Sequence, residues 1–180
     1  MIKISIEDLE AKLDRGFKKN YLSLGVDTAS RAGWAIVRTD DKDAHIEYGT
    51  VNVDSDDLFF KYDKIFEFFY DLVEKKIGPD NKNAIIVIED TFFGQNVKTL
   101  KMLIRVGMLV YLAGFLHGIK RYFILPSASR ATLGFKGNLK KSYVQQEFLK
   151  KTGIEMKGED EIDGLILALN GLLLKEEKVV

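Results

Sequence analysis

The chain has 180 residues, of which 46% are hydrophobic, two are proline and none is cysteine. That length and composition allow one sizeable hydrophobic core and favour a single domain. The lack of cysteine excludes disulfide bonds and thiolate metal sites and is typical of intracellular proteins, so we expect a cytoplasmic location. The two histidines, at positions 45 and 117, are too few and too far apart for a zinc site.

The formal net charge is zero, but the charge is unevenly distributed. Residues 91–151 carry 11 lysines and arginines and a single acid, a local charge of +10. Residues 1–90 carry 13 bases and 19 acids (−6), and residues 152–180 carry 3 bases and 7 acids (−4). A strongly basic third of a neutral chain is expected where a polyanion such as DNA lies over one face. Ordinary solvated helix surfaces are the alternative explanation.

The N-terminal segment is the first predicted element. Ser5 is a candidate helix cap and Ile6, Leu9 and Leu13 share one face, so residues 1–20 are predicted to form a helical N-terminal extension. Four acids among the first 14 residues are atypical of a secretory or transit peptide, so we expect no such leader.

Three strand-like runs follow, separated by short polar turns. Their close spacing predicts an antiparallel meander over residues 21–27, 33–38 and 45–53. Residues 57–76 place apolar side chains at intervals of three and four, which predicts a helix with a broad apolar face. The run 84–89 is rich in β-branched residues and is predicted to be a central strand buried on both faces.

The C-terminal half alternates helices with one more strand. The predicted elements are a helix over 97–117, a strand over 122–125 and two helices over about 140–151 and 160–175. Pro126 is taken as the end of the strand. Arg105 and His117 interrupt the longest apolar stretch, 102–119, so no membrane span is expected.

The order of these elements indicates the fold class. Three antiparallel strands followed by two parallel strands, with helices between them, predict an α/β fold with a mixed five-stranded sheet flanked by helices. Residues 21–180 are expected to form one domain.

Four acidic residues lie at the ends of these elements. Asp27 ends the first strand, Glu89 ends the fourth, and Asp160 and Asp163 stand at the start of the last helix. Two like charges about 4 Å apart repel by about 4 kcal/mol at an effective dielectric constant near 20, so a cluster of ionised carboxylates needs a cation. Oxygen donors suit Mg²⁺ or Mn²⁺. The pattern therefore predicts metal-dependent phosphodiester chemistry.

Each acid also has a simpler explanation. Asp27 is of a type common in turns at strand ends, Glu89 is an ordinary acid at a sheet edge, and the pair before the last helix suits a helix N-terminus. The flanking Glu159 and Glu161 leave open which acid accompanies Asp163.

Four segments, in this order, resemble the RuvC-type Holliday junction resolvases of the ribonuclease H-like superfamily. They are Gly-Val-Asp-Thr-Ala-Ser-Arg-Ala-Gly-Trp-Ala-Ile-Val (25–37), Ile-Glu-Asp-Thr-Phe-Phe-Gly-Gln-Asn (88–96), Gly-Asn-Leu-Lys-Lys-Ser-Tyr-Val-Gln (137–145) and Asp-Glu-Ile-Asp-Gly-Leu (160–165). The resemblance runs from about Tyr21 to the C-terminus. It implies a ribonuclease H-like fold and a homodimeric endonuclease that nicks two strands of a four-way DNA junction with Mg²⁺ or Mn²⁺, without a nucleotide cofactor.

The resemblance also implies roles for five residues. Asp27, Glu89, Asp160 and Asp163 match the family's acidic ligands, which would hold two metal ions about 4 Å apart to activate water and stabilise the leaving oxygen. Lys141 matches the family's basic residue near the scissile phosphate, where positive charge offsets the charge on the pentavalent centre. An ordinary solvated lysine is the alternative.

Other residues are candidates for contact with DNA. Phe92 and Phe93 closely follow Glu89, where an aromatic ring stacks on an unpaired base or, alternatively, packs into the core. Ser30 and Arg31 lie in the turn after Asp27, where a backbone or guanidinium contact to phosphate is one explanation. Ordinary turn chemistry explains these two residues equally well. The full set of predicted DNA-binding residues is Ser30, Arg31, Phe92, Phe93, Lys98, Lys101, Arg105, Lys136 and Lys140.

The helix predicted over 97–117 has more apolar surface than one sheet face needs. Gly107 and Gly114 would permit close approach of a second helix, so we expect a homodimer seam here. A wholly buried helix is the alternative.

Three other functions share some of these features. A branched-DNA-binding protein without activity and an RNA/DNA-hybrid nuclease would have the same fold. The turn after Asp27 also resembles the phosphate-binding turn of sugar kinases and actin-like ATPases, but those need two such lobes and 180 residues hold one.

Overall fold

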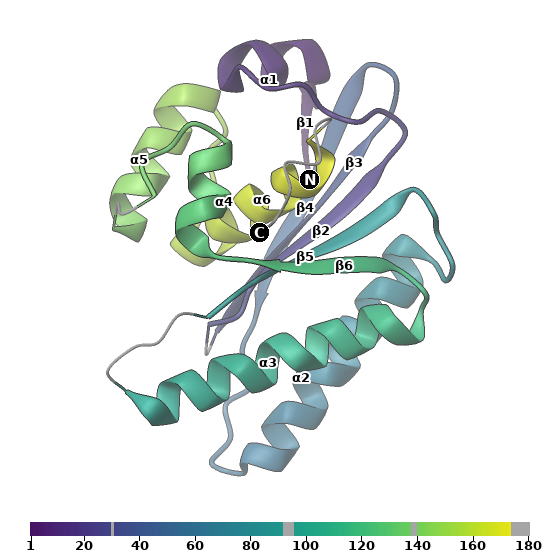
Figure 1. The fold of residues 1–180 in the computed structure, drawn as a ribbon, viewed down its shortest axis with the longest axis vertical. Helices are drawn as coiled ribbons and strands as arrows, with labels where there is room; N and C mark the ends of the chain where they lie inside the picture. The colour runs from purple at the N-terminus through teal and green to yellow at the C-terminus, as the bar shows by residue number, and fades with distance from the viewer. Residues whose placement is uncertain (30, 92–95, 138–139, 174–180) are drawn as a thin grey trace.

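The computed structural model describes residues 1–29, 31–91, 96–137 and 140–173. In these residues a six-stranded mixed sheet forms the centre, and helices cover both of its faces (Figure 1). The strands are β1 (Ile2–Ser5), β2 (Leu22–Asp27), β3 (Ala32–Thr39), β4 (Asp43–Val51), β5 (Ala84–Glu89) and β6 (Lys120–Ile124). Their order across the sheet is β1-β4-β3-β2-β5-β6. The predicted α/β class and mixed sheet are confirmed.

One half of the sheet is antiparallel and the other half is parallel. β3 pairs antiparallel with β2 and β4, which is the predicted meander. β5 pairs parallel with β2, and β6 pairs parallel with β5. β2 is buried along its whole length, because it lies between two strands and helices cover both faces.

The sheet has six strands rather than the predicted five, because Ile2–Ser5 form β1 and pair antiparallel with β4. The expectation of a helical extension over all of residues 1–20 is wrong for this strand. Its side chains alternate between partly buried and exposed, and four residues are too few to reveal a period of two in a sequence. Helix α1 (Ile6–Leu13) follows, with Ser5 as its N-cap. The domain boundary at residue 20 stays a prediction.

Two helical layers enclose the sheet. One face is covered by α2 (Leu58–Leu72), its π-helical continuation (Val73–Ile77) and α3 (Val97–Leu116), and the other by α1, α4 (Pro126–Thr132), α5 (Lys141–Thr152) and α6 (Glu159–Leu172) (Figure 1). Each face has its own hydrophobic core. Phe69 and Val110 belong to the first core, and Phe148, Leu165 and Leu169 belong to the second.

Helix α4 is absent from the sequence prediction, which takes Pro126 only as the end of a strand. Pro126 also lies in the first turn of this helix, where its missing N–H has no partner to lose and its fixed φ suits the helix. Seven residues are too few to show a helical period of apolar side chains. This short helix carries Arg130.

Helix α6 lies very close to the sheet because glycine occupies the points of contact. A Cβ atom on Gly25 of β2 would lie 2.1 Å from the carbonyl oxygen of Gly164 and 2.2 Å from the nitrogen of Ala168. A Cβ atom on Gly33 of β3 would lie 2.1 Å from the carbonyl oxygen of Asp160. Only a residue without a side chain permits such contact. The N-terminal part of α6 is therefore held against β2 and β3, with Asp160 at the start of β3.

Helix α3 is buried on one side only. Gly107 faces Phe123 and Gly114 faces Ile86, so the close approach predicted at these glycines is made with the protein's own sheet. The expected close approach of a second helix at these two glycines is therefore wrong. The alternative of a wholly buried helix is wrong too, because the opposite side of α3 is exposed. Among the described residues α3 is the one helix long and apolar enough to cross a membrane, a test that core helices also pass, and 28% of its apolar window is buried.

Gly25→Ala is expected to lower the free energy of unfolding by roughly 3 kcal/mol, because the added methyl group meets the backbone of α6. Gly114→Ala is the matched control, since its methyl group meets chiefly the end of the flexible Ile86 side chain. Alanine also favours a helix over glycine, so we expect the control to change stability by no more than about 1 kcal/mol. Urea unfolding followed by circular dichroism measures both, and equal losses would contradict the prediction.

Candidate active site

Asp27 and Glu89 lie at the same edge of the sheet. β2 and β5 are parallel neighbours, with Val26 in register with Ile88, and each strand ends one residue later. Parallel strands place their carboxyl ends together, which is why two acids far apart in the sequence become neighbours. Asp27 is buried, with 1% of its surface exposed, and Glu89 is partly buried.

The start of α6 adds two more acids. Asp160 and Asp163 are three residues apart and therefore share one face of the helix. The N-cap is Gly158, and no side chain in the described residues caps α6, so helix capping does not account for this pair. Of the flanking acids, Glu159 is exposed and Glu161 turns back over the backbone of Gly158. Asp160 is thus the acid that accompanies Asp163.

Lys141, the first residue of α5, joins three of these acids. Its Nζ lies 2.5 Å from Oδ2 of Asp27, 3.0 Å from Oδ1 of Asp160 and 3.3 Å from Oδ2 of Asp163. Its side chain is 35% exposed, whereas those of Asp27 and Asp163 are 2% and 5% exposed. Lys141 is therefore no ordinary solvated lysine, and it acts as the counter-ion of the cluster.

Arg130 is a second cation at the site, and the sequence analysis missed it. Its Nη2 donates to both carboxylate oxygens of Asp163, at 2.9 and 3.0 Å, and its Nε donates to Oδ1 at 3.3 Å. Both side chains are almost fully buried. Bidentate arginine–carboxylate pairs are strong and fix geometry. The one signal in the sequence is that Arg130 lies in the basic third of the chain. Its burial depends on helix α4, which the sequence analysis does not predict.

The cluster holds more negative charge than its two cations balance. Burial, together with the charges of Asp27 and Asp163, raises the pKa of Glu89 to about 8. Burial raises the pKa of Asp27 to about 6, although the ammonium group of Lys141 opposes the increase. Burial by itself lowers the pKa of Lys141, but the carboxylates of Asp27, Asp163 and Asp160 outweigh it and raise the pKa well above its usual value. Lys141 is therefore a permanent positive charge.

The residues present suit a hard divalent cation. Within the described residues no three acids are placed to bind one metal ion, and Lys141 instead bridges Asp27, Asp160 and Asp163. If all four acids and both bases are ionised, the cluster carries a net charge of −2, so it attracts divalent cations. All-carboxylate donors are those that Mg²⁺ and Mn²⁺ prefer.

The predicted DNA-binding residues that the structure describes are all exposed. Lys98, Lys101 and Arg105 lie on α3, and Lys136 and Lys140 lie just before α5. Two of these arginines also make contacts within the protein. The guanidinium carbon of Arg105 lies 5.7 Å from the centroid of the Tyr62 ring, and Nε of Arg31 donates to Oγ1 of Thr50 at 3.2 Å. Ser30, Phe92 and Phe93 lie outside the described residues.

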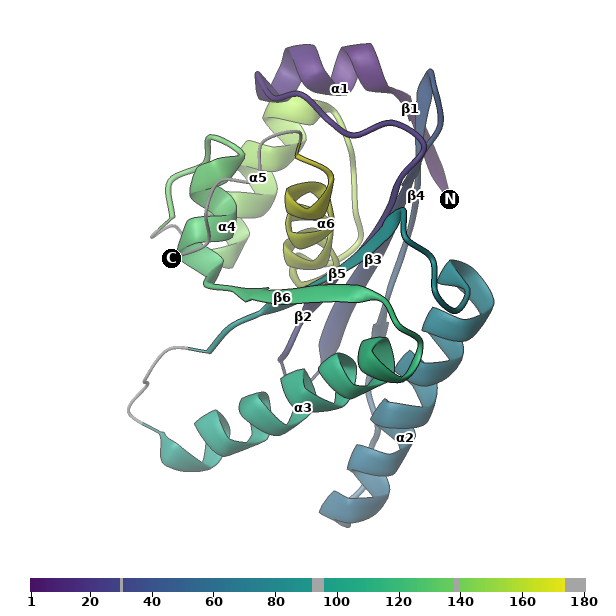
Figure 2. The same cartoon turned by 45° about the vertical axis from the view of Figure 1, so that its right-hand side comes forward.

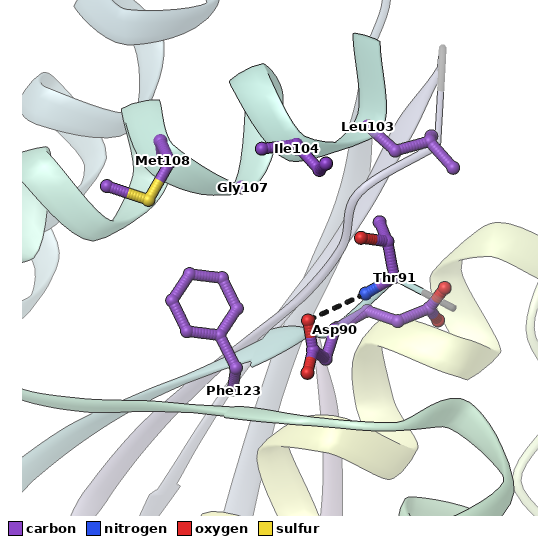
Figure 3. Close-up of a pocket in the computed structure, with 8 residues that line it drawn as sticks. Asp90, Thr91, Leu103, Ile104, Gly107, Met108 and Phe123 are labelled. Atoms are coloured by element: carbon purple, nitrogen blue, oxygen red, sulfur yellow. Dashed lines mark hydrogen bonds between the residues drawn. The ribbon is translucent and has the colours of Figure 1, made fainter. Parts of the chain in front are cut away.

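A hollow opens between the end of β5 and α3 (Figure 3). It has a volume of about 230 Å³ and is lined by Glu89, Asp90, Thr91, Leu103, Ile104, Gly107, Met108 and Phe123. Figure 3 shows the ring of Phe123 facing Gly107 and Met108 across the hollow. The carboxylate of Asp90 accepts a hydrogen bond from the Thr91 backbone nitrogen at 2.8 Å. One acid of the cluster, Glu89, thus adjoins a largely apolar recess.

Known families and structures match most of the chain. The family model described as "Crossover junction endodeoxyribonuclease RuvC" matches residues 23–170. RuvC of Thermus thermophilus is 17% identical, with a TM-score of 0.65 over 82% of this chain and 91% of that chain. The same protein in complex with a Holliday junction substrate is 16% identical, with a TM-score of 0.66 over 82% of this chain and 90% of that chain. The yeast mitochondrial Holliday junction resolvase Ydc2 is 11% identical, with a TM-score of 0.51 over 89% and 81%. No curated protein sequence matches.

Glu89→Gln is expected to reverse a pH-dependent loss of stability. The pKa of Glu89 is near 4.5 in the unfolded chain and about 8 in the folded protein, so the folded state binds more protons between these values. Stability contributed by protonated Glu89 is therefore present below about pH 4.5 and lost as the pH rises through about 8. We expect the variant to match wild type near pH 5 and to be more stable by roughly 1–3 kcal/mol near pH 8.5. Urea unfolding in EDTA tests this, and a less stable variant at the higher pH would contradict it.

Proposed function

The chain belongs to the RuvC family of crossover junction endodeoxyribonucleases, and we propose that it resolves four-way DNA junctions by metal-dependent hydrolysis of two phosphodiester bonds. The observation that carries this proposal is the convergence of Asp27, Asp160 and Asp163 on Lys141, with Glu89 at the next strand end. A structural relative was solved with a Holliday junction substrate, which supports a branched DNA as the partner.

The four acids would hold two Mg²⁺ or Mn²⁺ ions. Ions bound there would activate a water molecule for in-line attack on phosphorus and stabilise the leaving oxygen. Asp27 and Glu89, on adjacent strand ends, offer ligands from the rigid sheet, and Asp160 offers one from α6. Arg130 would keep the carboxylate of Asp163 oriented, because its Nη2 donates to both carboxylate oxygens.

Lys141 would act by charge and not by proton transfer. Its ammonium group, paired with three carboxylates, retains its proton at neutral pH. With metal ions bound to those acids, the partly exposed ammonium group would be free to face the phosphate being cut. Positive charge placed where negative charge develops lowers the barrier.

The flanking basic residues would bind the DNA backbone. Lys98 and Lys101 in the first turns of α3 and Lys136 and Lys140 before α5 are exposed around the acids, and lysines placed in this way neutralise phosphates. A DNA strand whose scissile phosphate lies at Glu89 would run past the apolar recess of Figure 3. The two nuclease alternatives, a DNA junction or an RNA/DNA hybrid as substrate, are separated by one assay on both substrates with Mg²⁺.

Asp27→Asn and Glu89→Gln, and likewise Asp163→Asn, are each expected to reduce junction cleavage by about a thousandfold or more, because they remove charge that holds the metal ions. Junction binding in gel-shift assays should stay near the wild-type level, because a negatively charged carboxylate does not attract the DNA phosphates. Asp90→Asn is the matched control, an adjacent exposed acid engaged with its own neighbour's backbone. Near wild-type cleavage by any of the three variants would remove that residue from the site.

We infer that the protein is a homodimer and that the exposed side of α3 forms the seam. Apolar side chains recur there along one stripe, with exposures of 41–58%: Ile104, Met108, Leu112, Phe115 and Leu116. A contiguous apolar stripe on a surface is typical of an interface. A two-fold dimer also presents two sites to a substrate that has two-fold symmetry, as paired nicks require.

Leu112→Asp is expected to convert the dimer into a monomer, because the variant buries a charge in an apolar seam. Leu149→Asp is the matched control on α5, at the other face of the sheet, since the two leucines are 41% and 42% exposed. Sedimentation at micromolar concentration should give about twice 20.5 kDa for wild type and the control. A monomeric wild-type protein that still makes paired nicks would refute the inference.

A further inference from the structure

Residues Lys12, Arg15 and Lys18 contact the last residues of three different helices. The Nζ of Lys12 donates to the carbonyl oxygen of Thr152, the last residue of α5, at 2.9 Å. The Nε of Arg15 donates to the carbonyl oxygen of Thr132, the last residue of α4, at 2.5 Å. The backbone nitrogen of Lys18 donates to the carbonyl oxygen of Leu172, the last residue of α6, at 2.6 Å.

These contacts satisfy groups that a helix leaves without partners. The last four carbonyl groups of an α-helix have no intrahelical donor. The C-terminus of a helix also carries partial negative charge, so a cation there is favourable. Lys12 and Arg15 supply both a donor and a positive charge at α5 and α4, respectively.

The segment that supplies these donors is itself firmly held. Its strand β1 pairs with β4 at the edge of the sheet. Leu9, Leu13 and Phe17 are buried in the same core cluster as Phe148 of α5. The bridge between Phe17 and Leu173 adds a further backbone contact to the chain just after α6. Figure 2 shows α1 on the same side of the sheet as α4, α5 and α6.

The three helices that this segment contacts carry the part of the candidate active site that does not come from the sheet. α4 carries Arg130, α5 begins with Lys141, and α6 carries Asp160 and Asp163. Only Val144, Phe148 and Thr152 of α5 are buried, so its packing alone holds it at few points. A helix moves as a rigid rod, so a tilt at Thr152 would displace Lys141 at its other end.

We propose that residues 12–18 form a clamp that sets the positions of Arg130 and Lys141 through the C-termini of α4 and α5. Lys12 and Arg15 are positioning residues in this account and touch neither DNA nor metal. The clamp lies outside residues 23–170, the part of the chain that matches the family model. The proposal rests on the proposed function for its kinetic readout.

The test uses the full-length protein with Lys12→Met and Arg15→Met combined. Methionine keeps much of each side chain's apolar length and removes the charge and the donor. A displacement of about 1 Å at a catalytic group costs on the order of a hundredfold, so we expect kcat for junction cleavage to fall by about ten- to a hundredfold. The Kd for the junction should change less than about twofold, because neither residue is placed in the DNA path.

Two further variants separate positioning from general damage. Lys12→Arg with Arg15→Lys keeps a cationic donor at both positions and should restore most of kcat. Lys19→Met removes one charge just after the clamp, at an exposed residue for which the described part of the chain shows no hydrogen bond or ion pair, and it should leave kcat unchanged.

Hydrogen exchange gives a readout that does not depend on cleavage. In the double methionine variant, amides of residues 126–132 and 141–152 should exchange faster, while those of α2 and α3 should be unchanged. Unchanged exchange in α4 and α5 would overturn the clamp, as would faster exchange throughout the protein or faster exchange with an unchanged kcat. If wild type cleaves no junction, the proposed function fails, and the exchange result still decides whether the segment holds the helices.

Discussion

The repulsion among four carboxylates at one edge of the sheet is the constraint on which the site depends. Like charges about 4 Å apart repel by about 4 kcal/mol at an effective dielectric constant near 20, and burial of Asp27 and Asp163 increases this cost. Lys141 and Arg130 offset part of it, yet burial and the charges of Asp27 and Asp163 still raise the pKa of Glu89. The fold thus maintains a region that is short of positive charge, which is the electrostatic condition that the proposed divalent cations would meet.

That cluster exists because backbone can approach backbone at two glycines. Without Gly25 and Gly33, α6 could not lie on β2 and β3, and Asp160 and Asp163 would be lifted away from Asp27. The same requirement explains why α6 is buried along nearly its whole length although it begins with three acids. The packing of α6 on the sheet therefore also brings the acids together.

Much of this arrangement follows from local sequence patterns. β2 and β5 are apolar runs that each end in one acid, and parallel pairing then places Asp27 beside Glu89. Strand β1 and helix α4 are too short for a period to show, so the sixth strand and Arg130 were not predicted. Gly107 and Gly114 indicated close approach, but a sequence does not say to what, and the neighbour is the sheet. Contacts such as Lys12 with Thr152 join residues far apart in the chain, and no local pattern indicates them.

The two cations at the site differ in a way that assigns them different tasks. The side chain of Arg130 is 9% exposed and holds both oxygens of Asp163, and breaking such a buried ion pair costs about 3–5 kcal/mol. The side chain of Lys141 is 35% exposed and shares its single ammonium group among three acids, so it is the less firmly held of the two cations. On the proposed function, Arg130 would be the fixed charge and Lys141 the one that turns toward a phosphate. The position of α5, which begins with Lys141, would then matter to cleavage as much as the lysine itself does.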